Sequence, residues 1–260
     1  MHDRCGYNKP DFIARLKYLY NIEKLSISEI ANKLINDHHA TFNTNSLHGY
    51  FIDNNIKRRS VSEAIHIQNQ NNMIFTASEL EIIYGILLGD GSMIRYEWSA
   101  SLEYKCKHFS VCQSLNSVLP RLGFYHPHQN KSINWYTHTS RFTHLLPLRD
   151  IWYPGGKRCP KIVPRNFIMT PETGYWWYLG DGSSARSQLR IATCNFTIED
   201  VEYLQSLLPV YSRLAKSKDK RRPGRIYPVI VIGRNEDKRK WLDYIGPCRH
   251  PEYAYRWILK

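Results

Sequence analysis

No stretch of the sequence reaches the roughly 18 consecutive apolar residues that a membrane-spanning helix needs. The first ten residues also lack the apolar run that is typical of a secretory signal. These absences predict a soluble, intracellular protein with no membrane partner. They do not distinguish a bacterial or phage cytoplasm from an organelle matrix.

Cysteine is sparse, and its spacing excludes two further classes of protein. The six cysteines are scattered without a CxxC pair, whereas disulfide scaffolds are short and rich in cysteine and zinc sites use closely spaced ligand pairs. Two histidines are adjacent, His38 and His39, but no HExxH motif occurs. We therefore expect reduced thiols and no zinc.

Acidic residues are outnumbered, with 23 Asp and Glu against 36 Lys and Arg, for a formal net charge of +13 over 260 residues. A polyanionic partner is the simplest reason for this excess, with nucleic acid first and an anionic membrane surface second. The length allows one or two domains with a sizeable core.

Residues 1–67 are predicted to form an all-α domain. Apolar residues recur at helical spacing over 11–20. Ser26 and Glu29 have the spacing of a capping box that begins a second helix. A third helix is expected over 44–54, with Asn55 as its C-terminal cap. A polar segment over 68–75 is predicted to be a linker.

This arrangement is similar to a helix-turn-helix, whose last helix enters the major groove. The third predicted helix exposes polar side chains, and a basic cluster follows it near the expected phosphates. We predict DNA contacts from Asn45, Ser46, His48, Lys57, Arg58 and Arg59. The alternative is a small helical bundle whose charge run is only solvated.

Residues 88–92 (LGDGS) recur as residues 179–183, so that Asp90 and Asp181 occupy equivalent positions. Each copy ends an apolar segment that opens with a helix signal: a capping box over 76–79, and Thr170 followed by Pro171. Strand, helix and strand patterns follow the first copy over 93–109, 114–122 and 133–139, and the second over 184–193, 198–208 and 227–233. The repeat predicts two halves of equal plan, 76–168 and 169–260, related by a pseudo-twofold axis.

A carboxylate at a helix C-terminus is disfavoured by roughly 0.3–1 kcal/mol, because that end carries partial negative charge. A divalent cation held by carboxylates, backbone carbonyls and water would compensate this accumulated negative charge. Gly85 and Gly89 would let a second helix approach and bring Asp90 and Asp181 together. We predict Mg²⁺ or Mn²⁺ ligands at Asp90, Asp181, Gly89 and Gly180. The alternative is that Asp-Gly marks an ordinary tight turn.

Residues 83–91 (IYGILLGDG) and 174–182 (GYWWYLGDG) resemble the LAGLIDADG signature. The second motif together with 193–201 (TCNFTIEDV) resembles the single-chain, intron-encoded members of that family. The resemblance covers about 75–260. It implies an α+β fold of two αββαββα-like half-domains with saddle-shaped antiparallel sheets. It also implies that the penultimate Asp of each motif ligates metal and that the motif helices form the interface. Leu88 and Leu179 replace the first Asp of the signature, and Trp176 replaces a small residue of the helix contact.

Two cationic positions follow from the same resemblance. Lys161 begins a KIVP segment similar to the one whose lysine organises the active-site water and screens the scissile phosphate. Arg256 follows Tyr255 where family members usually show Tyr-Lys, and a guanidinium cannot shed a proton as a general base would. Both are predicted catalytic residues, with ordinary phosphate binding or surface charge as the alternative.

In the family, the strands after each motif lie over the major groove. The resemblance therefore implies base or phosphate contacts from Arg95, Lys105, Lys107, Arg186, Gln188 and Arg190. The basic segment 216–225 is predicted to be a loop that follows the DNA backbone through Lys218, Lys220, Arg221 and Arg222.

The expected function is site-specific, metal-dependent cleavage of both strands of a long DNA target by a monomer with no obligate protein partner. Each half would hydrolyse one strand and leave a 3′ overhang, as in intron homing. One alternative is a non-cleaving transcriptional regulator on the same scaffold, and another is an RNA intron maturase. An intein is not expected, because no splicing segment flanks the repeat.

Overall fold

The computed structural model describes residues 9–38, 43–60, 63–64, 74–129, 133–156, 161–185, 187–218, 224 and 226–259. The chain divides into two compact units, unit 1 (residues 1–71) and unit 2 (residues 72–260). Most of the predicted linker 68–75 lies outside the described residues, and the predicted domain boundaries stay predictions. Within the described ranges, no helix combines the length and the apolar character needed to cross a bilayer.

The described part of unit 1 contains the three expected helices, α1 (Lys9–Asn21), α2 (Ile27–His38) and α3 (Thr44–Asp53). Each presents an apolar stripe to a common core, which is how short helices gain most of their stability. The buried core consists of Phe12, Leu16, Leu19, Tyr20, Ile30, Ala31, Leu34, Leu47, Phe51 and Ile56.

Local signals set two helix ends in unit 1, the start of α2 as predicted and the end of α3 within one residue of the prediction. The backbone N–H of Glu29 donates to Ser26 Oγ at 3.2 Å, and the backbone N–H of Ser26 donates to the Glu29 carboxylate at 2.7 Å, which completes the capping box. Helix α3 ends one residue earlier than expected, with Asn54 as its C-cap. Asn55 then takes the left-handed conformation (φ 51°), and the N–H of Ile56 donates to Phe51 O at 2.9 Å.

The described residues of unit 2 form two four-stranded antiparallel sheets of identical order, β1-β2-β4-β3 and β5-β6-β8-β7. The first half contains α5 (Ala77–Leu88), β1 (Gly91–Arg95), β2 (Ala100–Cys106), α6 (Phe109–Val118), β3 (His128–Gln129), β4 (Trp135–His138) and α7 (Leu145–Trp152). The second half contains α8 (Pro171–Asp181), β5 (Gly182–Ala185), β6 (Gln188–Ala192), α9 (Ile198–Ser206), β7 (Arg213–Lys218), β8 (Ile226–Ile232) and α10 (Asn235–Ile245). Short 3₁₀ helices lie at η1 (Pro120–Leu122) and η2 (Pro251–Arg256).

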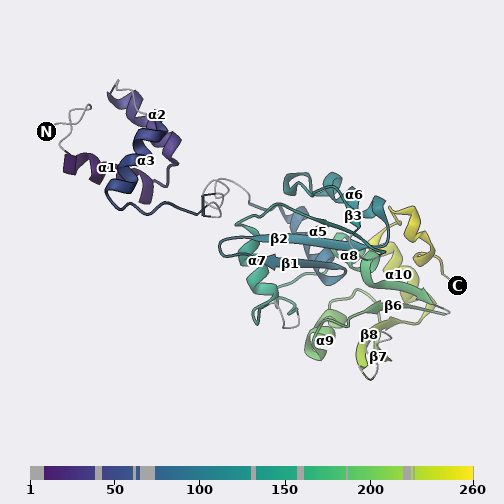
Figure 1. Cartoon of the computed structure of the whole chain (residues 1–260). Coiled ribbons are helices and arrows are strands. Elements are labelled where there is room, and N and C mark those ends of the chain that lie inside the picture. Colours follow the sequence, from purple (N-terminus) through teal and green to yellow (C-terminus); the bar gives the residue numbers. More distant parts are fainter. Residues whose placement is uncertain are drawn as a thin grey trace. The chain divides into compact units, whose positions relative to one another are not determined.

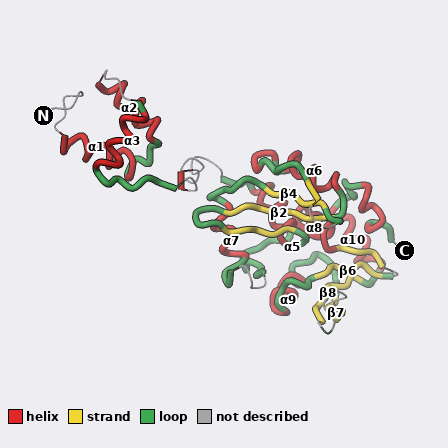
Figure 2. The backbone as a smooth tube through the Cα atoms, viewed as in Figure 1, coloured by secondary structure: helices red, strands yellow, loops and turns green. Residues whose placement is uncertain are grey.

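Both halves thus follow the order helix, two strands, helix, two strands, helix, which can be traced in Figure 2. The predicted α+β class and the equal plan of the halves are confirmed. Apolar residues of both halves belong to one core, in which α5 and α8 lie side by side behind the strands of the first sheet (Figure 1).

The stretch 93–109 has the expected strand character and forms a hairpin, in which the N–H of Tyr96 donates to Ser99 O at 2.8 Å. Two other element predictions were wrong in detail. The helix expected over 114–122 is α6, which begins at Phe109 and gives way to η1 at Pro120, since proline lacks a backbone donor. Residues 216–218 of the predicted basic loop belong to β7, which pairs with β8.

Candidate active site

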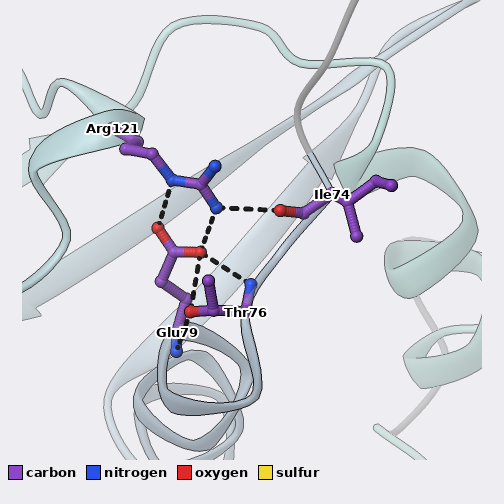
Figure 3. Close-up of polar contacts among 4 residues, drawn as sticks. All are labelled: Ile74, Thr76, Glu79 and Arg121. Atoms are coloured by element: carbon purple, nitrogen blue, oxygen red, sulfur yellow. Dashed lines mark hydrogen bonds and ion pairs between the residues drawn. The ribbon is translucent and has the colours of Figure 1, made fainter.

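The two motif helices are fixed at their N-termini by side chains close in sequence. In α5 the N–H of Glu79 donates to Thr76 Oγ1 at 3.2 Å, and Glu79 in turn accepts from the N–H of Thr76 at 2.8 Å. Figure 3 shows that Arg121 also reaches this carboxylate, with Nε 2.7 Å from Glu79 Oε1, and donates to Ile74 O. In α8 the N–H of Thr173 donates to Thr170 Oγ1 at 3.3 Å.

Small residues let α5 and α8 approach closely at the seam between the halves. A Cβ atom at residue 85 would lie 2.6 Å from the carbonyl oxygen of Thr173 and 2.6 Å from Trp176 Cβ, so only glycine fits. The seam is also tied by a hydrogen bond from Thr173 Oγ1 to Glu81 O at 2.9 Å. Trp176 fits opposite Gly85 because residue 85 has no Cβ atom, and its indole N–H donates to Glu172 on its own helix at 2.8 Å.

The same approach brings the two acidic residues together. A Cβ atom at Gly180 would lie 3.0 Å from the backbone nitrogen of Asp90 and 3.6 Å from Asp90 Oδ2. Asp181 is the next residue of α8, and its pKa is raised to about 8 by burial and by the negative charge of Asp90. The two carboxylates therefore lie close enough for Asp90, which is exposed, to repel Asp181, which is half-buried.

Lys161 lies at the C-terminal end of α5. It is 8% exposed, and its Nζ donates to Leu87 O at 2.7 Å and to Gly91 O at 2.6 Å, with Gly89 O at 3.4 Å. Leu87 O lies in the last turn of α5 and carries the negative end of the helix dipole, which a cation stabilises, whereas Gly91 O belongs to β1. Burial lowers the pKa of Lys161 to about 8, against the opposing effect of Asp181 and Asp90.

Arg256 holds the matching position at the end of α8. Its Nη1 donates to Leu179 O and, at 3.1 Å, to Gly180 O. The guanidinium also lies over the ring of Tyr253, 4.2 Å from its centroid. Both predicted catalytic cations thus bond the last carbonyls of a motif helix, a role that the sequence did not indicate.

The donor set suits a divalent cation that keeps part of its water shell. Two mutually repelling carboxylates meet at the seam, and Mg²⁺ is usually held by one or two carboxylates together with water and substrate phosphates. In the part of the chain that the structure describes, no three His, Cys, Asp or Glu side chains form a closed metal cage. The predicted carbonyl ligands Gly89 and Gly180 already accept from Lys161 and Arg256, although a carbonyl oxygen has a second lone pair.

The sheet residues predicted to contact DNA do not all share one face. Lys105 alternates with buried Tyr104 and Cys106, and Gln188 and Arg190 alternate with buried Leu189, so these three lie on the sheet faces turned away from the helices. Lys107 is exposed just beyond β2.

Arg95 differs from this group. It shares its row of β1 with buried Met93, opposite Ala100, and its Nε lies 3.3 Å from Asp150 on α7. Lys218 ends β7, whereas Arg186, Lys220, Arg221 and Arg222 lie outside the described residues.

An aromatic and histidine cluster on the outer face of the first sheet was missed. His128 and Tyr136 lie opposite each other, with ring centroids 5.1 Å apart, and His138 contacts both Tyr136 and Tyr125, at 5.4 and 4.7 Å. Strand alternation over Trp135–His138 was the available signal.

In unit 1 the predicted contacts also separate into two groups. Asn45, Lys57 and Arg58 are exposed and His48 is half-buried. Ser46 is exposed, but its N–H and hydroxyl bond the Asn43 side chain that caps α3, at 2.7 and 2.9 Å.

Arg59 is turned back onto unit 1. Its guanidinium lies 3.8 Å from the ring centroid of Tyr20 and donates to Lys24 O and Leu25 O, each at 3.1 Å. These contacts close the turn between α1 and α2, so Arg59 is engaged inside the domain rather than presented with Lys57 and Arg58.

Comparison with known proteins adds to this geometry. The family model described as the LAGLIDADG DNA endonuclease family matches residues 80–239, more than half of the chain. The structure of the homing endonuclease I-WcaI bound to its DNA recognition sequence is 18% identical and superposes with a TM-score of 0.59, covering 80% of this chain and 97% of that chain. At this identity the likeness shows the fold alone.

Two relatives are similar in sequence. The uncharacterized protein MJ1098 of Methanocaldococcus jannaschii is 28% identical over 205 residues, which are 68% of this chain and 75% of that protein. The cytochrome b mRNA maturase bI2 of Debaryomyces hansenii is 27% identical over 150 residues, which are 50% of this chain and 55% of the maturase.

Proposed function

Because the chain belongs to the LAGLIDADG DNA endonuclease family, we propose that it is a site-specific endonuclease that cleaves both strands of a DNA target. The observation that carries this proposal is the pair Asp90 and Asp181, each at the end of a motif helix, with Asp181 affected by the charge of Asp90. A monomer contains both acids, so each half can serve one strand, and we propose no obligate protein partner.

Burial and the charge of Asp90 raise the pKa of Asp181, and the two carboxylates fit Mg²⁺ or Mn²⁺ because a divalent cation would relieve the repulsion between them. When bound, the metal would polarise the scissile phosphate and lower the pKa of its water. Asp90 and Asp181 would hold it with help from the carbonyls of Gly89 and Gly180. No nucleophilic side chain is required of the protein.

Lys161 and Arg256 position the acids by holding the carbonyls at the ends of α5 and α8. Their charge also adds to the positive potential that a scissile phosphate would meet. Arg256 cannot release a proton, so we propose charge stabilisation alone for the second half.

Duplex DNA would lie against the outer faces of the two sheets. Lys105 and Lys107 of the first half, with Gln188 and Arg190 of the second, are the proposed contacts. Unit 1 would bind further duplex as a helix-turn-helix through Asn45, His48, Lys57 and Arg58. The net charge of +13 supports a strongly salt-dependent affinity.

Assistance to RNA splicing is the second candidate function. The similarity to the D. hansenii cytochrome b mRNA maturase favours it, although the match spans about half of that protein. Folded intron RNA would then be the ligand, and hydrolysis would not be needed.

The test is cleavage by the purified full-length chain of a library of long DNA duplexes in Mg²⁺ or Mn²⁺. We expect one sequence to be cut on both strands with a 3′ overhang, and no cutting in EDTA. Asp90→Asn should lower the cutting rate by roughly 10²- to 10³-fold and keep binding in Ca²⁺. Intact duplexes in every pool from a folded protein would overturn the proposal, and splicing of an intron RNA by the same preparation would favour the maturase reading.

A further inference from the structure

Strand register makes Glu103 and Arg190 equivalent residues of the two halves. Gly91, which follows Asp90, pairs with Tyr104, and Gly182, which follows Asp181, pairs with Ile191. One step further, Ser92 pairs with Glu103 in the first sheet, and Ser183 pairs with Arg190 in the second. The two side chains therefore stand at the same distance along the sheet from their acidic motif.

Both residues are half-buried and lie on the outer faces of their sheets. Glu103 stands between buried Leu102 and Tyr104, whose side chains point into the core, and Arg190 stands between buried Leu189 and Ile191. Their neighbours in the next strand differ, since Glu103 is opposite His138 and Arg190 is opposite Val231. Equivalent positions of the two halves thus carry opposite charges.

The Glu103 carboxylate is held in place by neighbours on its own sheet. It accepts a hydrogen bond from the Tyr136 hydroxyl on one oxygen and from Ser92 Oγ, at 3.3 Å, on the other. Burial and the Glu103 charge raise the pKa of Tyr136, which keeps this hydroxyl a donor. Among the described residues, no cationic side chain forms an ion pair with Glu103.

An unpaired acid is costly on a face that meets a polyanion, because it repels the phosphates. A carboxylate has about four lone-pair sites, and its two neighbours use two of them. The remaining sites can accept from an exocyclic amino group at the edge of a base. Cytosine N4 suits them better than adenine N6, because the adjacent N7 of adenine is an acceptor that would face the second carboxylate oxygen.

We propose that Glu103 and Arg190 select different bases at symmetry-related positions of the two half-sites: Glu103 accepts from cytosine N4, and Arg190 donates to guanine O6 and N7. This inference rests on the proposed function, since it requires that the outer sheet faces meet the major groove. It makes the target asymmetric at this pair of positions, even though the fold around them is nearly symmetric.

The experiment is a binding selection from a pool of randomised DNA duplexes by the full-length chain, in Ca²⁺ so that bound duplexes stay uncut. Sequencing the bound fraction gives the enriched base at each position. For the wild type we expect a cytosine preference in one half-site and a guanine preference in the other, each about tenfold over other bases, which corresponds to one good base contact.

Charge exchange identifies the residue responsible. Glu103→Arg should convert the cytosine preference to guanine, and Arg190→Glu should convert the guanine preference to cytosine, with all other positions unchanged. Glu103→Gln, which still accepts from Tyr136, should weaken the cytosine preference. Lys107→Ala is the matched control, since losing a phosphate contact should lower affinity for all sequences alike.

The outcomes separate this inference from the proposed function. Enriched bases that stay the same in Glu103→Arg and Arg190→Glu would overturn the inference and leave DNA binding standing. Thermal melting of the Glu103 variants and of Tyr136→Phe shows whether Glu103 only holds Tyr136 in place. If the Glu103 variants and Tyr136→Phe lose the same stability and the base preference is unchanged, the inference is also overturned. A folded wild type that binds no duplex would contradict the proposed function itself.

Discussion

In the first half of unit 2 a lysine donates to backbone carbonyls at the C-terminal end of the motif helix, and in the second half an arginine does so. Lys161 follows α7 and bonds carbonyls at the end of α5, whereas Arg256 follows α10 and bonds carbonyls at the end of α8. Each half therefore returns to its own motif helix after its last long helix. The symmetry is kept in the contact, although the two segments that supply it, KIVP and PEYAYR, share no pattern.

The difference between the two cations lies in burial. Lys161 is 8% exposed and has its pKa lowered, whereas Arg256 is half-buried and lies over Tyr253. Arginine remains charged at either site, whereas burial of the strongly hydrated lysine ammonium lowers its pKa. Equal backbone plans thus tolerate different side chains wherever the same carbonyls are satisfied.

Substitution of Asp90 or Asp181 should have the largest effect, on the cleavage rate, and comparing the two tests whether the halves are functionally equal. Asp90→Asn and Asp181→Asn should each lower double-strand cleavage by roughly 10²- to 10³-fold, because each removes a negative charge that holds the metal. Rates are measured on a plasmid that carries the selected target, with binding in Ca²⁺ as the control. A variant that cuts at the wild-type rate would show that its half does not use this acid.

Substitution at the seam should follow in size. Gly85→Ala should cost about 1–3 kcal/mol of unfolding free energy, because its Cβ would meet the backbone of α8 and the helices would have to separate. Gly89→Ala is the matched control, since its Cβ would find only ordinary contacts of 3.5–3.6 Å. Denaturant unfolding measures both, and equal stabilities would contradict the close packing described for α5 and α8.

Removing each cation sharpens the comparison of the two helix ends. Lys161→Met should destabilise unit 2 by about 2–3 kcal/mol, since it leaves buried carbonyls without a charged donor, and Arg256→Met should cost about 1 kcal/mol because water can replace it. Unfolding followed by tryptophan fluorescence gives both values. A larger loss for Arg256→Met would reverse the order that burial predicts.

The remaining expected effect depends on pH and concerns the N-terminal ends of the same helices. The Arg121 guanidinium beside Glu79 lowers the pKa of that carboxyl to about 2, so its stabilising effect is complete above the ordinary value near 4.5 and is lost as pH falls toward 2. Glu79→Gln should cost about 1–2 kcal/mol at neutral pH, a figure reduced by solvent around the 41% exposed Arg121, and the cost should vanish at low pH.

The corresponding pair in α8 serves as its control. Glu172 lies 2.9 Å from Arg249, with side chains 28% and 44% exposed, so Glu172→Gln should cost under about 1 kcal/mol. Both variants are followed by thermal melting between pH 2 and 7. A cost for Glu79→Gln that stays constant over this range would show that the ion pair does not stabilise α5.

Much of the fold followed from local patterns, and the errors arose where pairing was long-range. The capping box at Ser26 and Glu29 and the equal order of elements in the two halves were predicted and are confirmed. The inward turn of Arg59 and the ion pair of Arg95 with Asp150 could not be predicted, because each depends on a partner 34 or more residues away. β7 was missed because its lysines are typical of an exposed loop, whereas its strand conformation depends on pairing with β8.

The sequence by itself determined where the motif helices begin and end and that each carries an acid at its last turn, because caps, glycines and Asp-Gly act over three or four residues. Tertiary structure alone decided what surrounds those acids. Lys161 reaches Leu87 across 74 residues, Arg256 reaches Gly180 across 76, and strand register sets Glu103 and Arg190 at matching places. Such contacts depend on helix packing and sheet register, which the whole core fixes together and which no local pattern encodes.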